Sequence, residues 1–287
     1  MKKILSILFA LLWVISLNAQ VLTVYKSGRV LYCTAYTDSI VVTRAIPHAA
    51  TESAFAISDN SYVCFSPGNL QYHIATGTWR FADYQYDYIA ADITDTSYTG
   101  WIDLFGWGTG NNPTSIEDAN SKFTDWGTNV IGTDVANTWR TLTLDEWLYL
   151  FQHTRWTLAR VNGILGFMLL PDSFETPVGL AVSILGDGNL TDVSKNYSES
   201  DYSTNIYNSD EFVLLESAGA IFLPAAGARH DRILSACGQK GIYWTATKGT
   251  SKAAARYMSF TVTKALVSVN VHAARKYGYS VRLVRDL

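Results

Sequence analysis

Two carboxylates stand beside an arginine and two tryptophans in the segment TWRTLTLDEWLYLF, residues 138–151. Carboxylates in such company can transfer protons in catalysis, so Asp145 and Glu146 are candidate catalytic acids. The spacing of Thr143 and Glu146 also matches a capping box, in which each side chain bonds a backbone N–H group at a helix start. Acids in a first helical turn are further favoured by the helix dipole. We therefore predict that both acids begin a helix rather than carry out a reaction.

The apolar residues after this start have the spacing of one helix face. They fall at positions i, i+3, i+4 and i+7, which line up as a single stripe on a helix. These residues are Leu144, Trp147, Leu148 and Phe151. We predict that the stripe is buried.

Residues that bind metals or act as nucleophiles show no motif spacing elsewhere in the chain. The sequence contains no HExxH motif and no GxSxG motif. The histidines are scattered: His48, His73, His153, His230 and His272. The cysteines are odd in number and match no zinc spacing: Cys33, Cys64 and Cys237. We predict no metal centre and no cofactor, and we expect the cysteines to be buried as small hydrophobic residues.

Acidic loops leave two further kinds of chemistry open. The segment GDGNLTD, residues 186–192, places side-chain oxygens as a calcium loop does. It lacks the closing bidentate acid, so a polar turn is the preferred interpretation. The pairs Asp83 with Asp87 and Asp92 with Asp95 lie in aromatic loops. Such pairs serve glycoside hydrolysis only when they face each other across a cleft, and solvated surface acids are the simpler interpretation.

Composition excludes some classes of partner. Charged residues make up 16% of the 287 residues, aromatic residues make up 13%, and the net charge is −3. A chain without a basic patch has no electrostatic footprint for nucleic acid or for an anionic membrane. We expect neither partner.

The first residues have the order of a secretory signal peptide. Two lysines, an apolar run and Asn18-Ala19-Gln20 follow each other in MKKILSILFALLWVISLNAQ. We predict a signal peptide over residues 1–19, cleaved after Ala19, and an exported protein in the periplasm, at the cell surface or outside the cell. No second apolar run follows that could span a membrane.

The remaining chain divides into a small β module and a large domain. Residues 20–44 alternate as strands around the turn pair Ser27-Gly28. Residues 45–54 are small and polar with one proline, which is typical of a linker. Over residues 55–287, short strand runs outnumber helical segments, and a second helix is predicted over residues 209–218 with Asn208 and Glu211 as its capping pair. The main domain is therefore predicted to be α+β, mostly antiparallel sheet with long loops.

Several segments resemble known proteins. TWRTLTLDEWLYLF resembles the helix start of the sulfatase-modifying-factor family, the formylglycine-generating enzymes and their relatives. A more specific resemblance, covering nearly all of residues 62–287, is to exported Bacteroidetes proteins related to the Fibrobacter succinogenes major paralogous domain group. It rests on these segments in order: FSPGNLQY, TWRFADYQYDYI, GWIDLFGWGTG, LPD, AGAIFLPAAG, YWTAT and GYSVRLVR. This resemblance implies a C-type lectin-like fold with two helices, a small twisted sheet and long loops.

The resemblance allows an enzyme, a binding protein or a structural protein. Formylglycine-generating enzymes use a cysteine pair near their C-terminal end to bind copper, and residues 253–287 contain no cysteine. This disfavours the enzyme. Calcium-dependent sugar binding would need motifs of which LPD, residues 170–172, is only a partial match. We expect a secreted or surface-displayed adhesin or receptor for a protein or glycan, and a variable protein diversified by a retroelement is one form that it could take. A structural or tip subunit of a surface fibre is the alternative.

A binding surface is predicted near the C-terminal strands. In GIYWTAT, alternation sends Ile242, Trp244 and Ala246 toward a core. The opposite face then points outward with Tyr243, Thr245 and Thr247. Tyr and Arg are the residue types that most often anchor interfaces. We predict one contiguous exposed patch made of Arg229, His230, Arg232, Tyr243, Thr245, Thr247 and Tyr257.

Overall fold

Short antiparallel strands, joined by long loops, make up most of the chain in this computed structural model. The structure describes residues 21–26, 29–35, 40–44, 53–89, 97–115, 122–189 and 195–287. For residues 21–26, 29–35, 40–44 and 265–271 it describes the backbone alone. The predicted signal peptide and most of the predicted linker lie outside these ranges. Contacts divide the chain into two units, residues 1–49 and 50–287.

The first unit contains a three-stranded antiparallel sheet. Its strands are β1 (Val21–Lys26), β2 (Arg29–Ala35) and β3 (Ile40–Arg44), in that order. Lys26 pairs with Arg29, and the predicted turn pair Ser27-Gly28 lies outside the described residues. The strand pattern of this segment is thus as the alternation predicts.

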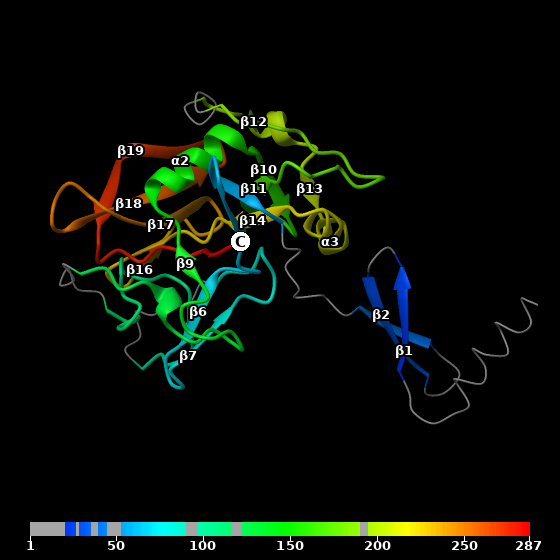
Figure 1. Ribbon diagram of the computed structural model, residues 1–287, viewed down its shortest axis with the longest axis horizontal. Coiled ribbons are helices and arrows are strands. Elements are labelled where there is room, and N and C mark those ends of the chain that lie inside the picture. Colours follow the sequence, from blue (N-terminus) through cyan, green and yellow to red (C-terminus); the bar gives the residue numbers. More distant parts are fainter. Residues whose placement is uncertain are drawn as a thin grey trace, which may run out of the picture. The chain divides into compact units, whose positions relative to one another are not determined.

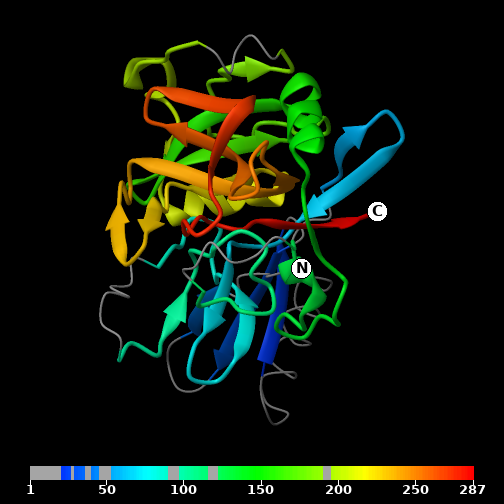
Figure 2. The same ribbon diagram turned by 90° about the vertical axis from the view of Figure 1, so that its left-hand side faces the viewer.

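The described residues of the second unit form four sheets and a hairpin, shown in two views in Figures 1 and 2. The largest sheet contains β10 (Arg155–Val161), β11 (Ile164–Leu170), β14 (Ile221–Pro224), β12 (Gly186–Asp187) and β13 (Ile206–Tyr207). A second sheet has the order β17 (Lys240–Lys248), β18 (Ala254–Thr261), β19 (Lys264–Ala274). Among the named strand pairs, only β10 with β13 is parallel.

Two further sheets bring together distant parts of the chain. One has the order β4 (Phe55–Ser58), β5 (Ser61–Phe65), β20 (Leu283–Asp286), β9 (Arg140–Thr141). The last strand of the chain thus lies inside a sheet whose edge is the first strand of the second unit. The other has the order β7 (Thr78–Phe81), β6 (Leu70–His73), β8 (Trp101–Ile102). The hairpin is β15 (Ala228–His230) with β16 (Ile233–Ser235).

The described residues form two α-helices, and both begin as predicted. Helix α2 (Leu144–His153) starts with the capping box of Thr143 and Glu146. Its buried residues are Leu144, Trp147, Leu150 and Phe151, so Leu150 takes the place predicted for Leu148, which is only partly buried. Helix α3 (Ser209–Ser217) starts with the capping box of Asn208 and Glu211. The described part of the chain also contains two short 3-10 helices, η1 (Trp126–Thr128) and η3 (Glu199–Tyr202).

The helix α3 is followed by a glycine whose conformation ends it. Gly219 has φ of +100°, in a region that side chains rarely adopt. A Cβ atom there would also lie 2.3 Å from the Ser53 hydroxyl. The helix predicted over residues 209–218 therefore ends just before Gly219, as SDEFVLLES and its Ala218 cap show.

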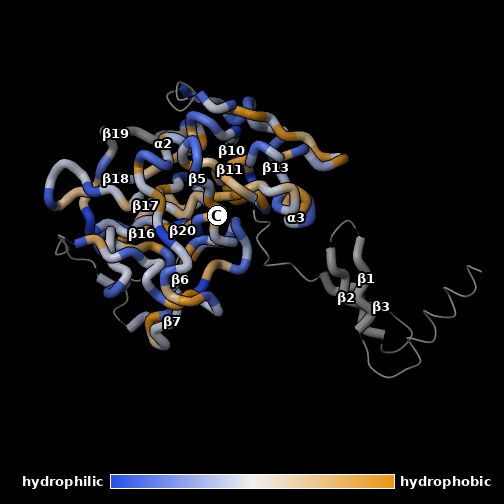
Figure 3. Tube along the Cα trace, in the orientation of Figure 1, coloured by the Kyte–Doolittle hydropathy of each residue, from blue (hydrophilic) through white to orange (hydrophobic). Residues whose placement is uncertain are grey.

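Three hydrophobic clusters fill the second unit, and β17 separates two of them. Tyr243 packs in one cluster with Met258 and Phe260, and Trp244 packs in the other with Ile242. The third cluster lies between β11, β14 and α3, where Figure 3 shows the hydrophobic segments of the chain gathered around β11. The predicted α+β class is therefore observed, with sheet predominating. Within the described ranges, no helix is long and apolar enough to cross a membrane.

Candidate ligand-binding surface

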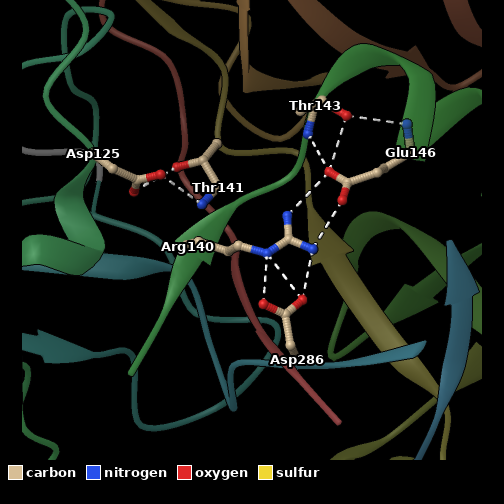
Figure 4. A network of polar contacts seen from close by, with 6 residues as sticks. All are labelled: Asp125, Arg140, Thr141, Thr143, Glu146 and Asp286. Atoms are coloured by element: carbon tan, nitrogen blue, oxygen red, sulfur yellow. Dashed lines mark hydrogen bonds and ion pairs between the residues drawn. The ribbon is translucent and has the colours of Figure 1, made fainter. Parts of the chain in front are cut away.

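Residues 138–151 connect the start of helix α2 to neighbouring strands through polar contacts (Figure 4). The Glu146 carboxylate accepts hydrogen bonds from the Thr143 backbone N–H at 2.7 Å and from Arg140 Nη1 at 3.1 Å. Arg140 also donates from Nη2 to Asp286 Oδ1 at 2.7 Å and from Nε at 3.0 Å. Glu146 is thus engaged in tying the start of α2 to strands β9 and β20. These contacts favour the capping interpretation over catalysis.

A second carboxylate in the same view also bonds the backbone. Asp125 accepts hydrogen bonds from the Thr141 N–H at 2.9 Å, the Thr141 hydroxyl at 3.0 Å and the Gly127 N–H at 3.1 Å. It thereby fixes β9 beside η1. Both ends of the strand that precedes α2 are held by acids.

The predicted patch of seven exposed residues does not form, because its central residue lies in the core. Tyr243 is 0% exposed. Its hydroxyl donates to the Pro224 carbonyl at 2.8 Å and accepts from Asn69 Nδ2 at 3.2 Å. Burial raises the pKa of the Tyr243 phenol. The phenol is therefore used inside the molecule.

Three more of the seven residues bond the protein itself. Thr245 is 0% exposed and its hydroxyl donates to the Arg256 carbonyl at 3.0 Å. The half-buried Thr247 accepts the N–H of Leu144, the first residue of α2, at 2.9 Å. Arg229 is 2% exposed and donates to the Asp231 carbonyl at 2.7 Å, and burial lowers its pKa to about 10.

The register of β17 and β18 gives the physical reason for this correction. Tyr243 pairs with Met258, whereas Tyr257 pairs with Trp244. Directly paired residues share a face of a sheet, so the two tyrosines lie on opposite faces. Each face of β17 packs on a hydrophobic cluster. Successive side chains of β17 therefore point into two different clusters, and neither set faces solvent.

The other members of the patch belong to a different surface. His230 and Arg232 are exposed and Tyr257 is half-buried. The His230 ring lies 4.2 Å from the ring of Tyr277, which is also half-buried, measured between ring centres. Tyr277 lies 6.3 Å from Tyr279.

Tyr279 connects these rings to Tyr257. The two tyrosine rings are 5.5 Å apart, and Tyr279 is 4% exposed. The buried Trp244 lies 4.4 Å behind Tyr279. We call His230, Tyr277, Tyr279 and Tyr257 the ring row. Its outer members are accessible and its inner member rests on the core.

Backbone contacts of Arg229 hold the ring row together. The Arg229 N–H donates to the Gly278 carbonyl at 2.8 Å, and the Gly278 N–H donates to the Arg229 carbonyl at 2.7 Å. A Cβ atom on Gly278 would lie 2.7 Å from Arg229 Nε. Only glycine allows this approach, which sets His230 beside Tyr277. Arg229 therefore supports the surface from beneath.

Charged groups lie at the hairpin end of the ring row. Lys276 Nζ pairs with the Asp231 carboxylate at 3.1 Å. Asp231 and Arg232 form the connection of the hairpin, and Asp231 has φ of 53°, a conformation that aspartate adopts more readily than most residues. Next to Arg232 stands the exposed Ile233. This surface offers flat rings, both signs of charge and one apolar side chain.

A buried acid that sequence reasoning missed is Asp103. It is 1% exposed, and Oδ2 accepts the Ile89 N–H at 2.7 Å. Burial raises its pKa to about 7, although the Ile89 hydrogen bond works in the opposite direction. Asp103 follows β8 in a loop, and no spacing in the sequence marks it. It adds a group that titrates near neutral pH.

The predicted cysteines and acidic loops form no site together within the described residues. Cys64 is buried as expected, whereas Cys237 is only partly buried, and both are free thiols; the side chain of Cys33 is outside the described part. Residues 190–192 of the acidic turn and both Asp92 and Asp95 also lie outside it. In the described ranges, no three His, Cys, Asp or Glu side chains form a group that could hold a metal ion.

Comparison with protein-family models, with curated proteins and with solved structures gives no match for this chain.

Proposed function

We propose that this chain is an exported, surface-displayed binding protein of adhesin or receptor type, built on a C-type lectin-like fold. The ring row carries the proposal. Half-exposed tyrosines supply area and a hydroxyl with little loss of side-chain freedom, which is why tyrosine is enriched in binding surfaces. The ligand is a protein or a glycan at the cell exterior.

The fold supports this proposal through the way it displays the rings. His230 ends β15, Tyr257 lies on β18, and Tyr277 follows β19. Three segments thus converge on one surface, and the buried Trp244 and Tyr279 fix it from below. A surface that is ordered before binding loses less entropy on binding.

Protein and glycan arrays probed with the mature chain test this function. We expect a ligand whose binding falls at least tenfold in Tyr257→Ala and in Tyr277→Ala. The matched control is Tyr62→Ala, because Tyr62 is 46% exposed on β5 and belongs to no part of the ring row. A ligand that binds all four proteins equally contradicts the proposed surface.

Export needs its own test. N-terminal sequencing of protein from the native host is expected to give a chain that begins at Gln20. A mature chain that still carries Met1 contradicts export through the predicted signal peptide. A receptor diversified by a retroelement is one form of this proposal. Its test is in the genome: it predicts a reverse-transcriptase gene beside a near-copy of the region that encodes the C-terminal strands.

A further inference from the structure

The sheet formed by β6, β7 and β8 presents a polar face that the ring row does not use. On β6, Leu70 packs in a hydrophobic cluster and Tyr72 packs against it. Gln71 and His73 alternate with these residues and therefore lie on the opposite face. The cross-strand partner of Gln71 is Arg80, and that of His73 is Trp101. These four side chains share the opposite face.

The guanidinium group of Arg80 is held in one orientation. Its central carbon Cζ lies 3.9 Å from the centre of the Trp101 ring, a close cation–π contact. Its Nε donates a hydrogen bond to Gln71 Oε1 at 2.9 Å, and Gln71 itself is buried. Stacking and this hydrogen bond leave the two Nη groups, which form no hydrogen bond or ion pair with any described residue. Two positioned donors are what a carboxylate accepts in a bidentate pair.

His73 adds a donor beside Arg80. The backbone N–H of Thr76 donates to His73 Nδ1 at 3.3 Å, and the Thr76 hydroxyl lies 3.0 Å from the same atom. A backbone N–H can only donate, so Nδ1 must be unprotonated and the ring proton must be on Nε2. The His73 ring is 4.9 Å from Trp101. The His73 ring and the Arg80 guanidinium therefore both contact one indole ring.

The surrounding groups are polar and accessible. Thr76 and Thr78 are exposed and their hydroxyls lie 2.8 Å apart, while Arg80, His73 and Trp101 are half-buried. Asp87 interacts electrostatically with Arg80 but forms no ion pair with it among the described residues. A face of donors and hydroxyls around one flat ring suits a ligand that carries both a carboxylate and hydroxyl groups.

We propose that Arg80, His73 and Trp101 form a binding site for the carboxylate of an acidic saccharide, such as a hexuronic acid unit. Arg80 binds the carboxylate, the His73 Nε2–H and the threonine hydroxyls meet the sugar oxygens, and Trp101 positions the guanidinium. The site shares no residue with the ring row, so either proposal can fail alone.

Calorimetric titration of the mature chain with a hexuronic acid oligosaccharide tests the site. We expect binding at least tenfold tighter than that of a neutral glucose oligomer of the same length. Arg80→Gln is expected to weaken it at least tenfold, since a charge-assisted pair is lost. Arg80→Lys keeps the charge without the planar guanidinium, so its affinity is expected to lie between those of the unaltered protein and Arg80→Gln. The matched control is Arg160→Gln, which removes an arginine on β10 that pairs with Glu199. This variant is expected to leave binding unchanged.

A second measurement does not depend on how the variants fold. Titration of the unaltered protein with the hexuronic oligomer is expected to shift the NMR signal of the Trp101 indole N–H, which the neutral oligomer leaves in place. Equal binding of the neutral oligomer, binding indifferent to Arg80→Gln, or no shift of the Trp101 signal would overturn the site. Tighter binding of a glutamate-rich peptide than of the hexuronic oligomer would overturn the saccharide as its ligand.

Discussion

Strand β17 and the ring row both contain tyrosine, but in opposite environments. Tyr243 on β17 is buried inside a hydrophobic cluster. Tyr257, on the neighbouring strand β18, is only half-buried and borders the surface. The difference comes from what lies on each side. β17 has a hydrophobic cluster on both faces, and the ring row has the core on one side only. Burial of a tyrosine is thus decided by the neighbouring layers and not by its own strand.

Removal of Tyr243 gives the largest effect that this comparison predicts. Tyr243→Ala is expected to lower the free energy of unfolding by about 3–5 kcal/mol, because it leaves a large cavity. It also leaves the Asn69 amide N–H without its partner and removes one of two donors to the Pro224 carbonyl, which keeps the Ala226 N–H. Urea denaturation measures the change. Tyr257→Ala is the matched control, with an expected loss of about 1 kcal/mol; equal losses would contradict the assigned environments.

The pH dependence of stability gives the next largest effect. Asp103 has a pKa of about 7 in the folded chain, well above the value of about 3.9 for an unfolded aspartate. Between these pH values the folded state binds more protons, so its stability falls as the pH rises from about 4 to about 7 and is then constant. The decrease is of the order of a few kcal/mol, because one pKa unit corresponds to about 1.4 kcal/mol.

Asp103→Asn isolates this contribution. The amide keeps an oxygen for the Ile89 N–H but does not ionise. Denaturation curves at pH 5 and pH 8 are expected to differ less for the variant than for the parent chain. The same difference in both proteins would show that Asp103 does not titrate as described.

Loss of the helix cap gives a smaller effect, outside both regions. Thr143→Ala removes the side chain that accepts the Glu146 N–H at 3.2 Å. A lost N-cap typically costs about 1 kcal/mol, and unfolding by urea measures it. Thr143→Ser keeps the hydroxyl and is expected to retain most of the stability. If serine is as destabilising as alanine, the cap is not the source of the effect.

The local features of the fold could be predicted from the sequence. Both capping boxes, the helix stop at Gly219 and the strands β5 and β7 depend on residues close in the chain. Alternation also identified Ile242 and Trp244 as buried. These signals are local, because they arise from backbone hydrogen bonds and from the period of each element.

The candidate surface depends on contacts between distant residues, which alternation cannot supply. Tyr277 reaches His230 only because Gly278 bonds the backbone of Arg229, 49 positions earlier. The sequence feature that marks this contact is Tyr-Gly-Tyr at residues 277–279, in which a glycine stands between two aromatic residues. Arg229 could not be predicted as buried, since a charged loop residue is usually exposed. The packing of a second segment over it decided its position.

The most direct test of the proposed surface is hydroxyl-radical footprinting of the native protein, with modified residues identified by mass spectrometry. Side-chain modification follows exposure to solvent. We predict clear labelling of His230, intermediate labelling of Tyr257 and Tyr277, and protection of Tyr243 and Tyr279. Labelling of Tyr243 at the level of Tyr257, or protection of all three outer residues of the ring row, would contradict the account.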